Sequence, residues 1–117
     1  MKLPFTVDLK DKVVAITGAG GVLMSGFAKA LAACGAKVAL LDINLENAQK
    51  FAEEIGENAI AVKTNCLDKQ SIIDAKKVIN EKFGKVNFLI NGAGGNSPKA
   101  STDNEYMTPD LEGVKDF

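Results

Sequence analysis

The amino-acid sequence predicts an α/β fold, a doubly wound parallel sheet with flanking helices, in which the first four strands lie in the order 3-2-1-4. Four short apolar runs are continuous rather than alternating, which is typical of strands that are buried on both faces. The segments between these runs repeat apolar residues every three or four positions, as amphipathic helices do. Each crossover is long enough to bring the next strand in parallel, and right-handed crossovers then give an open, doubly wound sheet.

The expected elements alternate strictly along the chain. The apolar runs that we interpret as strands are residues 13–16, 38–41, 59–62 and 88–90. The apolar residues that mark the three helical segments are Leu23, Phe27, Ala30, Leu31 and Cys34, then Leu45, Ala48, Ala52 and Ile55, and then Ile72, Ala75, Ile79 and Phe83. The predicted order is therefore β-α-β-α-β-α-β.

The ends of these helical segments carry residues that favour helix termini. Gly35, Gly56 and Gly84 follow the three segments, where left-handed C-terminal caps belong. Asn44 and Asp68 stand at N-cap positions, where a side-chain oxygen accepts a hydrogen bond from a free N–H group of the first turn. These signals set the expected helix boundaries.

The bulk composition narrows the class of function. The 117 residues are 46% hydrophobic and 25% charged with a formal net charge of -1, which is ordinary for one small soluble domain. This balance gives no electrostatic reason to expect nucleic acid or an anionic membrane as a partner, and the apolar runs are too short to cross a bilayer. Because the chain has no histidine and only two distant cysteines, we expect no metal site and a cytoplasmic location.

A glycine-rich loop lies between the first expected strand and the first expected helix. Gly18, Gly20 and Gly21 follow the strand directly, where glycine lets the backbone turn sharply and approach a pyrophosphate. The first free N–H groups of the helix, at residues 22–24, would face that anion. The pattern Gly-x-Gly-x-x-Gly is incomplete because Leu23 occupies its third glycine position. A tight strand-to-helix turn without a ligand is the alternative interpretation.

The P-loop of nucleoside triphosphatases is not matched. Gly21 and Gly26 have the glycine separation of that motif, but Phe27 and Ala28 occupy the positions of its lysine and its serine or threonine. Without the lysine a triphosphate loses its main charge contact. We therefore do not expect an ATPase.

Two further strand ends favour a dinucleotide. Asp42 ends the second strand, about 20 residues past the glycine loop, where an acidic side chain grips a ribose 2′-hydroxyl. Support of a helix N-terminus is the alternative role for this residue. Residues 91–95, Asn-Gly-Ala-Gly-Gly, follow the fourth strand, which neighbours the first in the order 3-2-1-4. The loops that follow the first and fourth strands flank the crevice where ligands bind. Together with Asp42 they form the rim of the sheet, and this rim predicts a dinucleotide site of the Rossmann type.

These motifs resemble the short-chain dehydrogenase/reductase family over nearly the whole chain. The family's Thr-Gly-x-x-x-Gly-x-Gly is matched at Thr17 and Gly18, with Val22 and Met24 in place of the later glycines. Its Asn-Asn-Ala-Gly corresponds to residues 91–94, Asn-Gly-Ala-Gly. The stretches Gly-Gly-Val-Leu and Ile-Asn-Gly-Ala-Gly-Gly-Asn-x-Pro-Lys-Ala look most like the mannonate/fructuronate type of sugar-acid oxidoreductase.

The resemblance implies roles for the matching residues. Thr17 would tie its loop to the region of Asn91, Asp42 would hold the adenosine ribose, residues 65–66 would border the adenine, and residues 91–94 would pass the nicotinamide ribose. The candidate cofactor-binding residues are Thr17, Gly18, Gly20, Gly21, Val22, Leu23, Asp42, Ile43, Asn65, Cys66, Asn91, Ala93 and Gly94.

The departures from the family pattern bear on the cofactor. Val22 is compatible with phosphate binding because the phosphate needs its N–H group. Met24 replaces a glycine that permits close helix packing, and its flexible side chain would fold over the ligand or fill a gap. Asp42 would repel a 2′-phosphate, and Ile43 and Ala19 offer no guanidinium to receive one. NAD is therefore the expected cofactor rather than NADP.

The catalytic residues of the family are not found in this chain. The family pairs a serine with Tyr-x-x-x-Lys, in which the lysine prepares the tyrosine for acid–base work. The single tyrosine, Tyr106, is followed at the fourth position by Asp110, a residue of the wrong charge. We assign no catalytic residue. We expect residues 1–95 to form a dinucleotide-binding unit and the polar residues 96–117 to form a loop that leads toward a missing catalytic half.

Two hypotheses of function follow from the sequence. The chain is the NAD-binding portion of an oxidoreductase that transfers hydride to or from a sugar acid or a similar hydroxy or keto substrate, and it is inactive alone. Alternatively it is a non-catalytic module that binds NAD or a partner, and an open edge at the fourth strand would favour a homo-oligomer. A structural remnant that binds no nucleotide is a third option.

Overall fold

The order of elements agrees with the sequence prediction. The computed structural model describes residues 7–93. Along the chain lie β1 (Val13–Thr17), α1 (Val22–Ala33), β2 (Lys37–Asp42), α2 (Leu45–Ile55), β3 (Ala59–Lys63), α3 (Lys69–Lys82) and β4 (Phe88–Asn91). Within this range no helix is long and apolar enough to span a bilayer.

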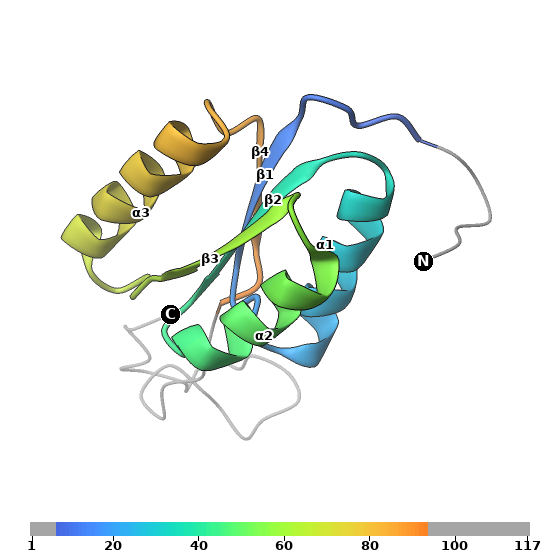
Figure 1. Cartoon of the computed structure of the whole chain (residues 1–117). Helices are drawn as coiled ribbons and strands as arrows, with labels where there is room; N and C mark the ends of the chain where they lie inside the picture. Colours follow the sequence, from blue (N-terminus) through green and yellow to red (C-terminus); the bar gives the residue numbers. More distant parts are fainter. Residues whose placement is uncertain (1–6, 94–117) are drawn as a thin grey trace, which may run out of the picture.

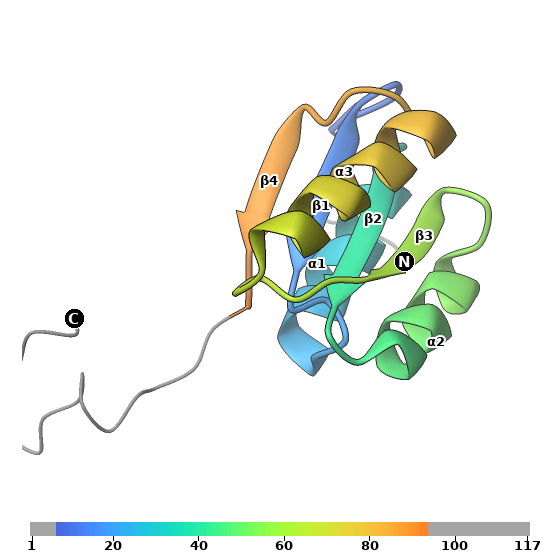
Figure 2. The same ribbon diagram turned by 90° about the vertical axis from the view of Figure 1, so that its left-hand side faces the viewer.

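The four strands form one parallel sheet in the predicted order β3-β2-β1-β4. Helices α1 and α2 lie on one face of the sheet and α3 lies on the other (Figure 1). Figure 2 shows β4 at one edge of the sheet and β3 at the other, with α3 crossing in front. From β1, strands β2 and β3 are added on one side of the sheet and β4 on the other. This change of side makes β1 and β4 the topological switch point, which is where ligands bind in open α/β sheets.

Two apolar layers explain why the strand runs are continuous rather than alternating. Val14 and Ile16, together with Val38 and Leu40 of β2, belong to the core beneath α1 and α2. The intervening strand residues, including Ala15 and the β2 residues that alternate with the first set, belong to a second core beneath α3. Because both faces of β1 and β2 are covered, the interior positions of these strands are all apolar, and the polar residues Lys37, Asp42 and Thr17 lie at strand ends.

The fourth strand is less buried than its apolar run predicts. Phe88 and Leu89 are 51% and 58% exposed, and only Ile90 of the apolar run is partly covered. The reason is that β4 lies at an edge of the described sheet and α3 does not cover it. A groove of about 550 Å³ follows from this arrangement, lined by Ala15, Ala75, Ile79 and Leu89 among others.

The helix termini follow the sequence signals. The side chain of Asn44 accepts a hydrogen bond from the N–H group of Asn47 at 3.2 Å, and Asp68 accepts one from Gln70 at 3.0 Å. All three predicted C-terminal glycines have positive φ, although the ψ of Gly56, -143°, lies outside the left-handed helical region.

The start of β4 is fixed by a residue that the helix and strand patterns do not reveal. The N–H group of Val13 donates to Oδ1 of Asn87 at 2.8 Å, and the N–H group of Asn87 donates to the carbonyl of Val13 at 2.8 Å. This reciprocal pair sets the register of β4 against β1, which aligns Thr17 with Asn91 at the opposite end.

Candidate functional site

The candidate residues gather at the carboxyl edge of the sheet. Thr17 is in register with Leu41 on one side and Asn91 on the other, so β1, β2 and β4 end at the same level. The strand arrowheads and the start of α1 lie together at this edge (Figure 2). Residues 18–21, 42–43 and 92–93 follow these strand ends, and residues 65–66 follow β3. Gly94 lies outside the described residues, as do Tyr106 and the segment 96–117.

Thr17 joins the loop after β1 (the first loop) to the loop after β4 (the fourth loop), as the family resemblance implies. Its Oγ1 atom accepts hydrogen bonds from the N–H groups of Gly92 and Ala93, both at 3.1 Å. The carbonyl of Thr17 also accepts from the N–H of Gly92 at 3.1 Å. Thr17 is only 8% exposed, so these bonds form away from competing water. The side chain of one threonine therefore sets the spacing of the two glycine-rich loops.

Gly18 is required by the same junction. Its φ is +67°, a backbone conformation that residues with a Cβ rarely adopt. A Cβ at this position would lie 2.6 Å from the carbonyl oxygen of Gly92 and 2.8 Å from the nitrogen of Ala93. The first loop can pass this close to the fourth only without a side chain.

Asp42 holds the glycine loop and the entry to α2. Its Oδ2 atom accepts from the N–H of Gly20 at 2.8 Å, and its Oδ1 atom accepts from the N–H of Asn44 at 2.9 Å. A Cβ at position 20 would lie 2.8 Å from Oδ2, which explains the glycine there. Asp42 therefore also supports the start of α2, its alternative role, although the N-cap of α2 is Asn44. Each carboxylate oxygen has a second lone pair, so the group can still accept from a ribose hydroxyl.

The N-terminus of α1 is open toward the same edge. Gly21 is its N-cap with φ -85° and no side-chain capping bond, and the first turn contains no acidic residue. The leading N–H groups of a helix have no partner within the helix and carry the positive end of its dipole. Val22 and Leu23 are 88% and 69% exposed. This end of the helix can therefore receive an anion such as a pyrophosphate.

The side chain of Met24 fills a gap, one of the two expectations for it. Its Cγ and Sδ atoms occupy the space that a Cβ at Gly92 would need. The side chain packs against the core beneath α1 and α2. Sequence reasoning singled out Met24 as a departure from the family pattern, but it did not single out Gly92 or identify that the two residues meet.

The loop after β3 presents exposed groups at the far side of the rim. Asn65 and Cys66 are both exposed, and Oδ1 of Asn65 accepts from the N–H of Leu67 at 3.0 Å. Leu67 is 98% exposed and Ile43 is 62% exposed. Sequence reasoning did not single out Leu67, and its exposure, together with that of Ile43, is an apolar feature that only the structure reveals.

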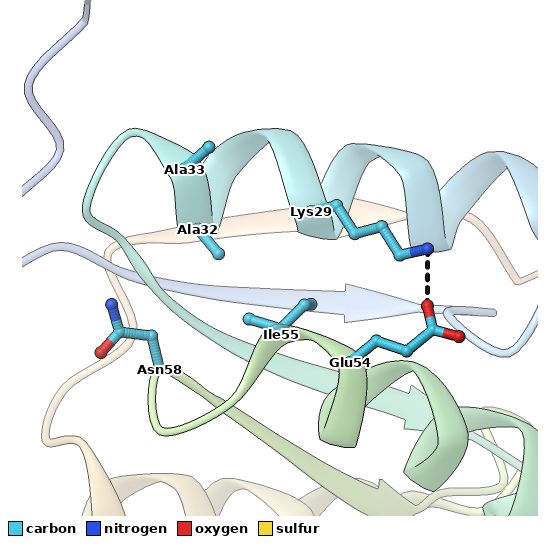
Figure 3. A pocket seen from close by; sticks show the side chains of 6 residues that line it. All are labelled: Lys29, Ala32, Ala33, Glu54, Ile55 and Asn58. Atoms are coloured by element: carbon cyan, nitrogen blue, oxygen red, sulfur yellow. Dashed lines mark ion pairs between the residues drawn. The ribbon is translucent and has the colours of Figure 1, made fainter. Parts of the chain in front are cut away.

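Outside this edge, the structure has a pocket of about 280 Å³ between the ends of α1 and α2 (Figure 3). Lys29 and Glu54 face each other across it, with Nζ and Oε2 2.7 Å apart, and Lys29 lies over the ring of Phe51. The hydrogen bond from Lys29 lowers the pKa of Glu54. Because Lys29 and Glu54 pair with each other, they link α1 to α2 and leave the pocket without a free charge for a ligand. Among residues 7–93 no cluster of three or more His, Cys, Asp or Glu could hold a metal.

Comparison with known proteins places this geometry in a family. Residues 12–112 match the model of the short chain dehydrogenase family. An uncharacterized oxidoreductase of Haemophilus influenzae is 49% identical over 114 residues, which cover 95% of this chain and 40% of that protein. Galactitol 2-dehydrogenase of Agrobacterium fabrum is 42% identical over 85 residues, which cover 73% of this chain and 33% of that protein.

Solved structures agree with the fold. A candidate D-mannonate oxidoreductase from Haemophilus influenza, solved with bound NAD, has a TM-score of 0.75 and 50% identity over 89% of this chain and 38% of that one. A 3-ketoacyl-(acyl-carrier-protein) reductase from Brucella melitensis, complexed with NADH, has a TM-score of 0.69 and 39% identity over 70% of this chain and 34% of that one. The resemblance to sugar-acid oxidoreductases is thus confirmed. The chain spans about 40% of the length of the Haemophilus influenzae relative, and it belongs to the short chain dehydrogenase family of oxidoreductases.

Proposed function

We propose that this chain is the NAD-binding portion of a short-chain oxidoreductase that acts by hydride transfer on a sugar acid or a similar hydroxy or keto compound. The observation that carries the proposal is the junction at the strand ends. Thr17 holds the first and fourth loops together while the N-terminus of α1 stays open beside them. An elongated ligand with an anionic centre and a ribose on either side matches this combination better than a simple turn does.

Different described residues would contact different parts of the proposed cofactor. The N–H groups at the start of α1 would receive the pyrophosphate, and the Asp42 carboxylate would accept from the adenosine ribose. Exposed Ile43 and residues 65–67 would border the adenine, and residues 91–93 would border the nicotinamide ribose. When bound, the nicotinamide supplies the acceptor or donor of the hydride. The chain itself contributes binding and orientation, and we assign no acid–base residue among its 117 residues.

The preference for NAD rather than NADP follows from the charge of Asp42. Both of its oxygens face backbone N–H groups at the rim, so the carboxylate is fixed where a 2′-phosphate would enter. Two like charges about 4 Å apart repel by about 1–4 kcal/mol at effective dielectric constants of 80 to 20. We therefore expect NADPH to bind at least about fivefold more weakly than NADH.

Isothermal titration calorimetry of the chain with NADH and with NADPH tests the cofactor. Saturable binding of NADH with weaker binding of NADPH supports the proposal. Absence of binding by both nucleotides would show that the edge is a structural remnant, and tighter NADPH binding would show that Asp42 does not set the preference. A panel of keto acids assayed for NADH oxidation by this chain should give no turnover, and robust turnover would contradict our assignment of no catalytic residue to it.

A second candidate function is supported by the exposed fourth strand. Phe88 and Leu89 are more than half exposed beside an apolar groove, and an unpaired apolar strand edge favours association. We propose that a second copy of the chain pairs at β4. Light scattering should then report a dimer that Leu89→Lys dissociates, whereas Val78→Lys, which places the same charge on exposed α3, should not. A monomer at all concentrations would reject this candidate.

A further inference from the structure

Gly92 is exposed on one side and contacts three parts of the fold on the other. Its N–H group donates to the carbonyl and to Oγ1 of Thr17, both at 3.1 Å. Its carbonyl faces Gly18, where a Cβ would lie 2.6 Å from the carbonyl oxygen. On a third side it faces the Cγ and Sδ atoms of Met24, which comes from the first turn of α1. The residue thus lies at the point where β1, β4 and α1 converge.

The need for glycine at position 92 is set by space and not by backbone conformation. The four glycines with positive φ in the described chain are Gly18, Gly35, Gly56 and Gly84, and Gly92 is not among them. A Cβ built at position 92 would collide with Met24 and would lie 2.7 Å from the carbonyl oxygen of Thr17. The obstacle on the helix side is therefore a side chain, and it is removable.

We propose that Met24 is a positioning residue for the cofactor site, because its side chain braces Gly92 and so holds the Gly92–Ala93 peptide in place. This inference rests on the proposed function. Met24 and Gly92 form a matched pair, in which a large side chain on the helix occupies the room that a side chain on the loop would otherwise take. Both positions depart from the family's motifs. Met24 replaces a smaller residue, the last glycine of Thr-Gly-x-x-x-Gly-x-Gly, and Gly92 replaces a larger one, the second asparagine of Asn-Asn-Ala-Gly.

The physical reason is the weak restraint on the loop without this brace. Glycine has more backbone freedom than any other residue, and Gly92 directly follows the end of β4. Thr17 fixes the N–H groups of Gly92 and Ala93, and Met24 packs on the side of Gly92 where a Cβ would lie. A methionine side chain is long and flexible enough to fill such an irregular gap. Loss of its outer atoms should widen the range of loop positions and weaken binding of the ligand that the loop borders.

A double-mutant cycle on the 117-residue chain tests the pair. The variants are Met24→Ala, Gly92→Ala and the double variant, each measured by thermal unfolding and by NADH titration. Alanine keeps the helix propensity and the N–H group of position 24 while it removes Cγ and Sδ. Leu31→Ala is the matched control, because Leu31 is a partly buried apolar residue further along the same helix.

We expect Gly92→Ala to lower the Tm by about 4–8 °C or more. The double variant should lose several degrees less than the sum of the two single losses, because one of the two obstacles is gone. The carbonyl of Thr17 remains as the other, so recovery is partial. Met24→Ala should raise the Kd for NADH about three- to tenfold. Leu31→Ala should lower the Tm without changing the Kd, and its effect should add to that of Gly92→Ala.

Each result decides one part of the inference. Strictly additive Tm changes for Met24→Ala and Gly92→Ala would overturn the matched pair. An unchanged Kd in Met24→Ala, together with a Tm loss like that of Leu31→Ala, would overturn the positioning role, and this comparison holds even if Gly92→Ala does not fold. If the unmodified chain binds no NADH, the proposed function and the positioning role fail together, while the Tm cycle still decides whether the pair is coupled.

Discussion

Gly18→Ala is the sharpest test of how the two glycine-rich loops meet. A left-handed backbone costs a residue with a Cβ about 1–2 kcal/mol, and forcing that Cβ into neighbouring atoms costs about 1–3 kcal/mol more. Here φ is +67°, and the neighbours at 2.6–2.8 Å are backbone atoms of residues 92–93, which cannot rotate away. The free energy of unfolding should therefore fall by about 2–5 kcal/mol, from a total of about 5–15 kcal/mol.

The assay is urea denaturation combined with NADH titration, and two other glycines serve as controls. Gly21→Ala should unfold near the midpoint of the unmodified chain, because φ is -85° there and the nearest atom to its Cβ is 3.5 Å away. Gly26→Ala, within α1 and with no atom within 4 Å, should stabilise the chain by up to about 1 kcal/mol. If Gly18→Ala unfolds at the same urea concentration as these controls and binds NADH equally well, the loops do not meet as described.

Three further perturbations address the rim and the link between α1 and α2. Thr17→Val should lower the free energy of unfolding by about 0.5–1.5 kcal/mol and weaken NADH binding, because the N–H group of Ala93 loses its acceptor and that of Gly92 keeps only the Thr17 carbonyl. Thr17→Ser should restore most of both quantities in denaturation and titration experiments. Asp42→Ala should lower stability by about 1–3 kcal/mol and narrow the ratio of NADPH to NADH affinity, and an unchanged ratio measured by calorimetry would separate its structural role from cofactor choice. The hydrogen bond from Lys29 lowers the pKa of Glu54 below 4.5, so its stabilising effect is complete above that pH and disappears as the pH falls through the lowered pKa. Glu54→Gln should therefore slightly reduce the fall of Tm as the pH is lowered into the acid range. If Tm falls equally in both proteins, the ion pair makes no measurable contribution to stability.

The sequence alone determined the alternation of strands and helices, the strand order and the loops that form the rim. These features are local or follow from local patterns. Continuous apolar runs report burial on two faces, spacing of three or four reports a helix, and Asn44 and Asp68 act as N-caps through atoms only a few residues away. The right-handed crossover rule limits the possible topologies, and the glycine-rich loop after the first strand favours the Rossmann order, which places Thr17, Asp42 and Asn91 at one edge.

Only the tertiary structure decided how these rim residues contact one another. Gly92 requires glycine because Met24, from a distant helix, occupies its side-chain space, and no local pattern around either residue records that contact. The use of both Asp42 oxygens by backbone N–H groups likewise depends on the path of the first loop past the second strand. The physical reason is that periodicity and capping act over a few residues, whereas close packing is set by the volume that remains once helix and sheet have docked.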